Sequence, residues 1–150
     1  MECMKQEFTI TTLEDWRTLA KDLAKILIPG HIFALKGDLG AGKTTFVQAL
    51  AEAMGSKSTP KSPTFSLMRT YGVKTASGIK RLIHVDAYRI ETDEDFRVLD
   101  LDEELASGDA VLALEWPERV DGWIKKHEKH VLMFSIVQKG ETRIATLEQN

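Results

Sequence analysis

Positions 37–45 read GDLGAGKTT and combine glycines with a lysine and two threonines. Gly37, Gly42, Lys43 and Thr44 fit the spacing G-x-x-x-x-G-K-[ST], in which glycines let the backbone curl around phosphate and point several N–H groups inward. In such a loop the lysine reaches the β and γ phosphates, and the threonine hydroxyl binds magnesium. The residues therefore predict a nucleotide phosphate site.

A phosphate loop that does chemistry also needs an acid at the end of a nearby buried strand, to hold or orient magnesium. RLIHVD ends at Asp86 and VLALE ends at Glu115, each after a run of apolar residues. Alternatively, either carboxylate caps the helix that follows it or pairs with a basic neighbour such as Arg89 or Arg119. We predict a role in the nucleotide site, and which acid contacts the metal stays open.

A third candidate lies in KSPTF, residues 61–65. Pro63 restricts Ser62 to an extended conformation, so Thr64 follows on a defined turn. A hydroxyl placed after the phosphate-loop helix suits a switch that orders on the γ-phosphate and magnesium. The same tripeptide is also typical of an ordinary turn, and the spacing alone leaves both interpretations open.

The elements that position these residues alternate between strand and helix patterns. Apolar runs and period-two alternation predict strands at residues 7–12, 31–36, 64–73, 80–90, 110–116, 131–138 and 142–149. Apolar residues at helical spacing predict helices at 13–26, 43–54 and 117–127, and a short one within the acidic segment 91–105. Together they predict an α/β fold, a three-layer α/β/α sandwich with a mixed, mostly parallel sheet and a C-terminal hairpin.

Composition bounds the remaining possibilities. A chain of 150 residues with 43% hydrophobic and 29% charged residues predicts one globular domain, residues 1–150. A net charge of −3 gives no overall attraction to nucleic acid or to an anionic membrane. The single Cys3, the lack of a signal peptide and the lack of a long apolar run predict a cytoplasmic protein without a membrane contact.

Four motifs, GDLGAGKTTF, SPTFSLMRTY, HVDAYR and LEWPERV, occur in the order and at about the spacing of the TsaE (YjeE) family. The chain resembles this bacterial family over nearly its whole length. The resemblance implies a P-loop fold, binding of ATP and Mg²⁺, weak ATP hydrolysis, and assembly with the transferase subunits TsaB and TsaD. That pair installs threonylcarbamoyl on the adenosine beside the anticodon of tRNAs that read codons beginning with A.

Residue roles follow from the matching motifs. The resemblance implies that Lys43 and Glu115 are catalytic, that Thr44 and Glu115 hold Mg²⁺, and that Asp86 positions water or completes the metal shell. It favours the switch interpretation of Thr64 and places Trp116 beside the nucleotide, although Trp116 is equally compatible with core packing. The predicted nucleotide contacts are Asp38, Leu39, Gly40, Ala41, Gly42, Lys43, Thr44, Thr45, Thr64 and Trp116.

Two other functions share a phosphate loop. A small-molecule kinase remains the alternative, although the chain shows no lid insertion with clustered arginines and has little length for an acceptor pocket. A GTPase-like switch lacks its N-K-x-D guanine motif. Arg89 and Arg119 are candidate arginine fingers, but either could simply pair with an acid. Slow hydrolysis that rises on complex formation is therefore expected.

Charge is also unevenly distributed along the chain. Residues 57–81 carry six basic residues and no acid, whereas residues 91–104 are acidic with Arg97 as the only base. Such blocks are usually solvated faces. Alternatively, the basic stretch contacts tRNA or an acidic partner surface, and otherwise tRNA is reached only indirectly through the other subunits.

Overall fold

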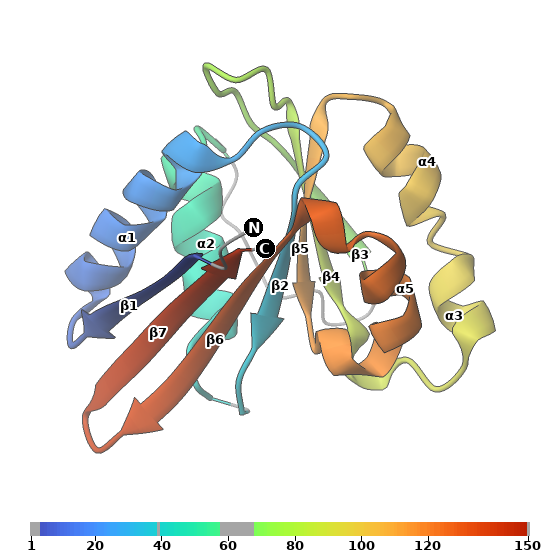
Figure 1. Cartoon of the computed structure of the whole chain (residues 1–150). Coiled ribbons are helices and arrows are strands. Elements are labelled where there is room, and N and C mark those ends of the chain that lie inside the picture. Colours follow the sequence, from blue (N-terminus) through green and yellow to red (C-terminus); the bar gives the residue numbers. More distant parts are fainter. Residues whose placement is uncertain (1–3, 39, 58–67, 150) are drawn as a thin grey trace.

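The computed structural model describes residues 4–38, 40–57 and 68–149, and within them seven strands form one sheet (Figure 1). The predicted site residues Leu39 and Thr64 lie outside the described residues. The strand order across the sheet is β1-β7-β6-β2-β5-β4-β3. The strands are β1 (Met4–Ile10), β2 (Ile32–Lys36), β3 (Met68–Gly72), β4 (Arg81–Asp86), β5 (Ala110–Glu115), β6 (Val131–Lys139) and β7 (Thr142–Gln149).

The sheet is mixed, as predicted. Its central strands β6, β2, β5 and β4 pair in parallel. The outer strands pair antiparallel, β1 with β7, β7 with β6, and β3 with β4. Strands β6 and β7 are the predicted C-terminal hairpin, and Lys139 lies opposite Thr142 at its turn.

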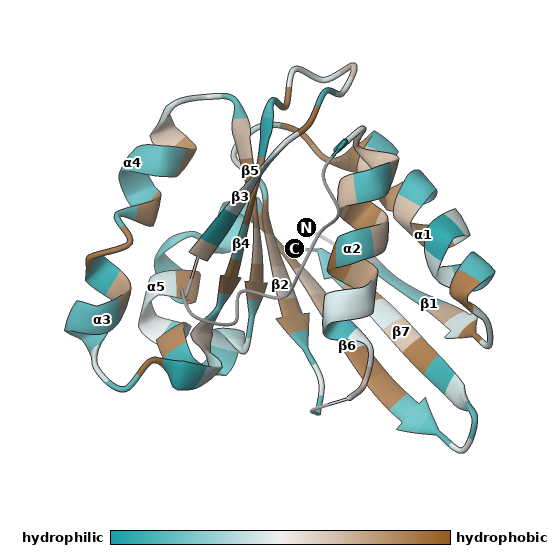
Figure 2. Cartoon of the chain, turned by 180° about the vertical axis from the view of Figure 1, so that it is seen from behind, coloured by the Kyte–Doolittle hydropathy of each residue, from teal (hydrophilic) through white to brown (hydrophobic). Residues whose placement is uncertain are grey.

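Helices cover both faces of the sheet (Figure 1). One face carries α1 (Leu13–Ile26) and α2 (Lys43–Ala53); the other carries α3 (Asp93–Arg97), α4 (Leu101–Ala106) and α5 (Asp121–Lys126). Each face buries its own hydrophobic cluster. Figure 2 shows hydrophobic residues concentrated along the central strands, with hydrophilic residues on the helices. The predicted three-layer architecture is confirmed.

The first helix begins where its sequence predicts. The Thr12 side chain accepts from the backbone N–H of Asp15, and Asp15 accepts in return from the backbone N–H of Thr12, which forms a capping box. Trp16 is 3% exposed and packs against Phe46 of α2 with ring centroids 5.8 Å apart. Trp16 therefore belongs to the hydrophobic core between α1 and α2.

Several predicted elements differ in extent from the structure, beginning with the strand predicted at 7–12, which runs from Met4 to Ile10. The strand predicted at 80–90 ends at Asp86, which caps the 3-10 helix η1 (Ala87–Arg89). The helix predicted at 117–127 is divided into the 3-10 helix η2 (Pro117–Val120) and α5, since Val120 leaves helical geometry with φ −131°. The acidic segment forms two short helices, because Asp100 adopts a left-handed conformation between them with φ +54°.

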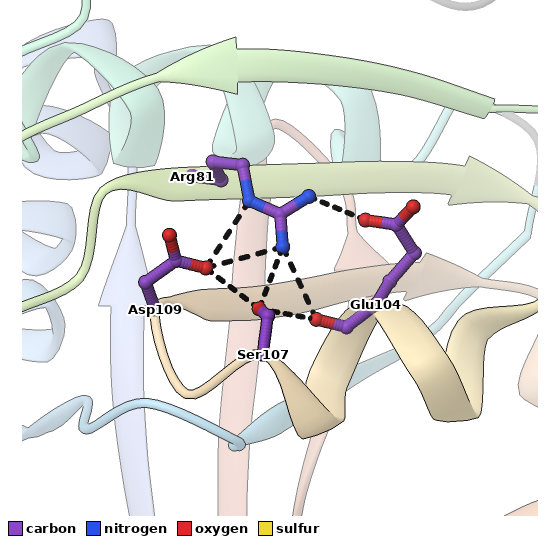
Figure 3. Close-up of polar contacts among 4 residues, drawn as sticks. All are labelled: Arg81, Glu104, Ser107 and Asp109. Carbon is purple, nitrogen blue, oxygen red and sulfur yellow. Dashed lines mark hydrogen bonds and ion pairs between the residues drawn. The ribbon is translucent and has the colours of Figure 1, made fainter.

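A polar cluster around Arg81 ties the amino end of β4 to its neighbours (Figure 3). The guanidinium donates to the side chains of Glu104, Ser107 and Asp109 and to the Glu104 carbonyl. The Ser107 hydroxyl lies 2.7 Å from both the Glu104 carbonyl oxygen and Oδ1 of Asp109, so it donates its one proton to either acceptor. The cluster therefore joins β4 to α4 and to the residue before β5.

In the part of the chain that the structure describes, no helix is both long enough and apolar enough to span a membrane. A further 3-10 helix, η3 (Glu128–His130), leads from α5 into β6.

Candidate functional site

The carboxyl ends of three parallel strands meet at one edge of the sheet. Asp86 at the end of β4 lies opposite Glu115 at the end of β5, and Glu115 lies opposite Leu35 near the end of β2. The phosphate loop (residues 37–45) follows β2 and leads into α2. Ligands in open α/β sheets bind outside the carboxyl ends of the strands, so the topology alone favours this edge as a binding site.

A cavity of about 460 Å³ opens at this edge. It brings together eight of the predicted residues: Gly40, Gly42, Lys43, Thr44, Thr45, Asp86, Glu115 and Trp116. Two other predicted loop residues do not line the cavity: Asp38 is exposed, and Ala41 is buried in the hydrophobic cluster. A backbone contact from Asp38 or Ala41 to phosphate does not require the side chain to line the cavity, because such a contact uses only the N–H group.

Glycines shape the loop for two different reasons. A Cβ on Gly37 would lie 2.9 Å from the carbonyl oxygen of Ile136, so only glycine permits this approach to β6. Gly42 has φ +113°, and a Cβ there would lie 3.0 Å from the Trp16 ring. Helix α2 begins after Gly42 without a side-chain cap, which leaves its first N–H groups free of the usual capping partner.

Lys43 is held inside the loop. Its side chain is buried, its ammonium donates to the carbonyl of Gly37, and Nζ lies 3.8 Å from the centroid of the Trp116 ring. Burial lowers the pKa of Lys43, while the nearby carboxylates of Glu115 and Asp86 partly oppose that shift. A desolvated cation above a phosphate cradle is a strong site for an anion, because little solvent screens it.

Glu115 is buried at 3% exposure and is bound on one side by a histidine. Its Oε2 lies 2.6 Å from Nε2 of His84, which is 1% exposed. His84 is not among the site residues predicted from the sequence. Its signal is its position two residues before Asp86, which places both side chains on the same face of β4.

Asp86 combines the two roles that the sequence left as alternatives. Its Oδ1 accepts from the backbone N–H of Tyr88 at 3.0 Å, so it caps η1. It also lines the cavity opposite Glu115. The Asp86 carboxylate that caps η1 is therefore also part of the cavity wall.

Trp116 forms a wall of the cavity in a strained backbone conformation. Its φ of +61° is uncommon for a bulky residue, and its N–H donates to the carbonyl of Leu35 at 3.2 Å. The ring packs at 5.0 Å from Tyr88, over which the Arg119 guanidinium lies at 5.6 Å. Trp116 therefore both packs and contacts the site lysine.

The opposite wall was missed by the sequence analysis. It consists of Ile10, Thr11, Thr12, Leu13, Trp16 and Arg143. Arg143 comes from β7 and approaches the carbonyl of Gly40 at 3.5 Å, although 103 residues separate the two in the chain. Its Nε is buried and has no hydrogen-bond partner among the described residues. Only the fold brings this arginine to the loop.

These residues fit a magnesium nucleotide better than a bare metal ion. In the described ranges, no three His, Cys, Asp or Glu side chains gather to hold a metal. Magnesium is commonly bound by one or two carboxylates together with phosphate oxygens. Thr44, Asp86 and Glu115 around a phosphate loop match that requirement.

Lys61 of the basic stretch 57–81 lies outside the described residues, and the described part of the stretch does not form one basic face. Arg81 points into the cluster of Figure 3 and is paired with Glu104 and Asp109, so the predicted basic face loses this member. Lys74 lines a separate hollow of about 410 Å³ together with Lys21 and Lys25 of α1. Three lysines therefore gather beside the later part of α1, whereas Leu13 and Trp16 near its start line the cavity at the phosphate loop.

Comparisons with known proteins agree with this geometry. Residues 10–145 match the family TsaE, described as threonylcarbamoyl adenosine biosynthesis protein TsaE. The chain is 41% identical to the tRNA threonylcarbamoyladenosine biosynthesis protein TsaE of Aquifex aeolicus over 79% of this chain and 81% of that protein. It is 34% identical to the protein of the same name in Mycobacterium tuberculosis, over 92% and 83% of the two chains.

A solved structure is also similar. The crystal structure of Bacillus subtilis YdiB superposes with a TM-score of 0.72 and 26% identity, covering 99% of this chain and 88% of that one. The overall fold is therefore similar to that of an experimentally determined protein.

Proposed function

The chain belongs to the TsaE family, whose members act in tRNA threonylcarbamoyladenosine biosynthesis, and from this premise we propose that it is the ATP-hydrolysing subunit of that machinery. In this proposal it binds ATP with Mg²⁺, hydrolyses it slowly alone, and hydrolyses it faster when joined to the transferase subunits TsaB and TsaD. The observation that carries the proposal is the buried Lys43 beside Asp86 and Glu115 in one cavity.

The cavity offers separate places for the two ends of ATP. The triphosphate follows residues 37–45, where the loop N–H groups and the start of α2 face it. The base lies against the opposite wall, where Leu13 is 53% exposed and the Arg143 guanidinium makes a long contact to the carbonyl of Gly40. An apolar side chain beside a guanidinium suits the face and the acceptor atoms of a nucleobase.

Each site residue has a role in hydrolysis. Lys43 transfers its hydrogen bond from the Gly37 carbonyl to phosphate oxygens, where its charge stabilises the transferring phosphoryl group. Thr44 and Glu115 would hold Mg²⁺, which would neutralise negative charge on the phosphates. Asp86, oriented by the Tyr88 N–H, positions the attacking water or completes the metal shell.

The isolated chain and the complex differ in whether a partner subunit can provide an arginine that stabilises the transition state. Arg119 packs over Tyr88 rather than lining the cavity wall. Arg143 does line the cavity, but from the wall assigned to the base. A group contributed by a partner subunit explains why turnover should rise on assembly, since such a group is worth about 10³–10⁵ in rate in related P-loop systems.

Steady-state phosphate release tests the proposal. The chain is assayed alone and with TsaB and TsaD, with ATP and with GTP, in Mg²⁺ and in EDTA. We expect Mg²⁺-dependent ATP hydrolysis that rises at least about tenfold with the partners, a conservative fraction of a full trans-acting group. Full activity of the isolated chain, or a preference for GTP, would overturn the partner-gated ATPase.

Substrate phosphorylation needs its own control. Released phosphate is compared with consumed ATP in the absence of any small-molecule acceptor. Equal amounts are the expected result, because water is then the acceptor. ATP consumption that starts only when an acceptor is added would favour the small-molecule kinase instead.

A further inference from the structure

His84 is a buried polar residue on β4, which lies between β5 and the edge strand β3. It lies on β4 directly opposite Ala113 of β5, and Glu115 is two residues further along β5. Ala113 leaves space beside it because its side chain is a single methyl group. The imidazole of His84 and the carboxylate of Glu115 therefore meet as diagonal neighbours on the face that α2 covers.

Burial of both side chains favours one direction for the hydrogen bond between His84 and Glu115. A separation of 2.6 Å between Nε2 and Oε2 requires a proton between the two atoms. The other ring nitrogen, Nδ1, is buried and has no partner among the described residues. A proton on Nδ1 would leave an N–H without an acceptor, so the favoured arrangement donates from Nε2 and keeps Nδ1 as a lone pair.

We propose that His84 is a positioning residue that holds the Glu115 carboxylate ready for magnesium. The inference rests on the function proposed above. One oxygen of Glu115 is fixed by Nε2–H, which leaves Oε1 as the oxygen that can bind a cation. Hydrogen bonds of this kind to metal-binding carboxylates orient them and tune the metal site.

The orientation of the Glu115 carboxylate matters because of Lys43. Lys43 lies near Glu115 and its charge interacts with that carboxylate, yet its ammonium is bound to the Gly37 carbonyl and packed on Trp116. A Glu115 freed from His84 could turn towards Lys43 and neutralise it. His84 thus keeps the acid for magnesium and the lysine for phosphate.

Two matched substitutions separate positioning from packing. His84→Gln carries an amide N–H donor at about the same reach from the backbone as Nε2. His84→Asn carries its amide at the position of Nδ1 and cannot reach Glu115 in the same way. Both are polar and neutral, so a merely structural role would be disturbed by both.

The experiment measures Mn²⁺ binding to the ADP-loaded full chain from the spin-resonance signal of free Mn²⁺, with ADP affinity in EDTA measured separately. We expect His84→Asn to weaken Mn²⁺ affinity by about 10–100-fold. We expect His84→Gln to stay within about threefold of wild type, and ADP affinity in EDTA to stay within about threefold for both. Thermal unfolding identifies any variant that does not fold.

A double substitution completes the test. Glu115→Gln should weaken Mn²⁺ binding, and adding His84→Asn to it should cause no further loss, because the two act through one carboxylate. If Glu115→Gln weakens Mn²⁺ binding and His84→Asn does not, the role of His84 is overturned while the proposed function stands. If wild type with ADP binds no Mn²⁺, the magnesium site fails and this inference fails with it.

Discussion

Strands β4 and β5 carry a polar cluster at each end, and the two clusters are built in opposite ways. At the amino end, Arg81 is joined to Glu104 and Asp109 by ion pairs. At the carboxyl end, no ion pair among the described residues joins Lys43 to Asp86 or Glu115, although the charges influence one another. Groups that satisfy one another stabilise the fold, whereas groups left without a charged partner are available to a ligand.

Two arginines show the same contrast. All three nitrogens of the Arg81 guanidinium donate to partners within the Figure 3 cluster. Arg143, in the wall of the cavity at the phosphate loop, has a buried Nε without a partner among the described residues and a long contact to Gly40. We infer that Arg81 contributes to stability and Arg143 to binding, which the following substitutions can separate.

The largest effect is expected for Lys43→Ala. ATP turnover should fall by about 10²–10³-fold, because a buried charge aimed at the transferring phosphate is lost. The free energy of unfolding should not fall, since the substitution also removes a desolvated charge. Phosphate release and urea denaturation measure the two quantities.

The control for Lys43 is Lys80→Ala, an exposed lysine just before β4. It should change neither quantity. Similar activity losses from both lysines would mean that overall charge matters rather than this cavity.

Arg81→Ala should lower the free energy of unfolding by about 1–3 kcal/mol, because it leaves the partners of a charge-assisted cluster unpaired. ADP affinity should be unchanged. Arg97→Ala is a suitable comparison, since its pair with Glu94 is at 3.5 Å and its side chain is 77% exposed. That change should stay within about 0.5 kcal/mol. A loss of ADP affinity in Arg81→Ala with unchanged stability would break the comparison.

Arg143→Ala should weaken ADP binding by about 3–10-fold, the size of one lost hydrogen bond, while the free energy of unfolding changes by less than about 0.5 kcal/mol. Stability is spared because the guanidinium makes little use of its donors in the fold. Calorimetric titration and urea denaturation provide the measurements. Should Arg143→Ala instead destabilise the chain and leave ADP binding intact, the two arginines would have the same role.

The smallest effect concerns acid pH at the Arg81 cluster. Hydrogen bonds from Ser107 and then from Arg81 hold the pKa of Asp109 below its ordinary value of 3.8. A carboxylate with a lowered pKa contributes stability above the ordinary value, and this contribution is lost as the pH falls through the lowered pKa. The free energy of unfolding should therefore fall less steeply in Asp109→Asn than in wild type between about pH 5 and pH 3. Identical slopes would remove Asp109 from the stabilising cluster.

Local signals in the sequence were sufficient for much of this structure. A few consecutive residues are enough to recognise the phosphate loop, the start of α1, and the acids Asp86 and Glu115. Asp86 and Glu115 could be paired in advance because parallel strands end at the same edge of the sheet. The resemblance of four motifs to one family added the assignment, which the comparisons confirm.

Residues joined only by topology could not be predicted. The contact between His84 and Glu115 depends on the register of β4 and β5, which no local pattern specifies. Arg143 reaches the loop only because β7 returns beside β6, next to β2. The pairing of Arg81 with α4 likewise needs the position of a helix whose packing is set by the whole fold.

The central claim is that the cluster of Lys43, Asp86 and Glu115 is a nucleotide switch that serves chemistry in other subunits. Reconstituted tRNA modification tests this claim most directly. TsaB, TsaD, tRNA and a threonylcarbamoyl donor are combined with ATP and with wild-type chain, Lys43→Ala or Arg81→Ala, and modified tRNA formed per transferase complex is counted. We expect repeated cycles with wild type and Arg81→Ala, and at most about one product per complex with Lys43→Ala, because its hydrolysis is about 10²–10³-fold slower. Repeated cycles with Lys43→Ala would contradict the account.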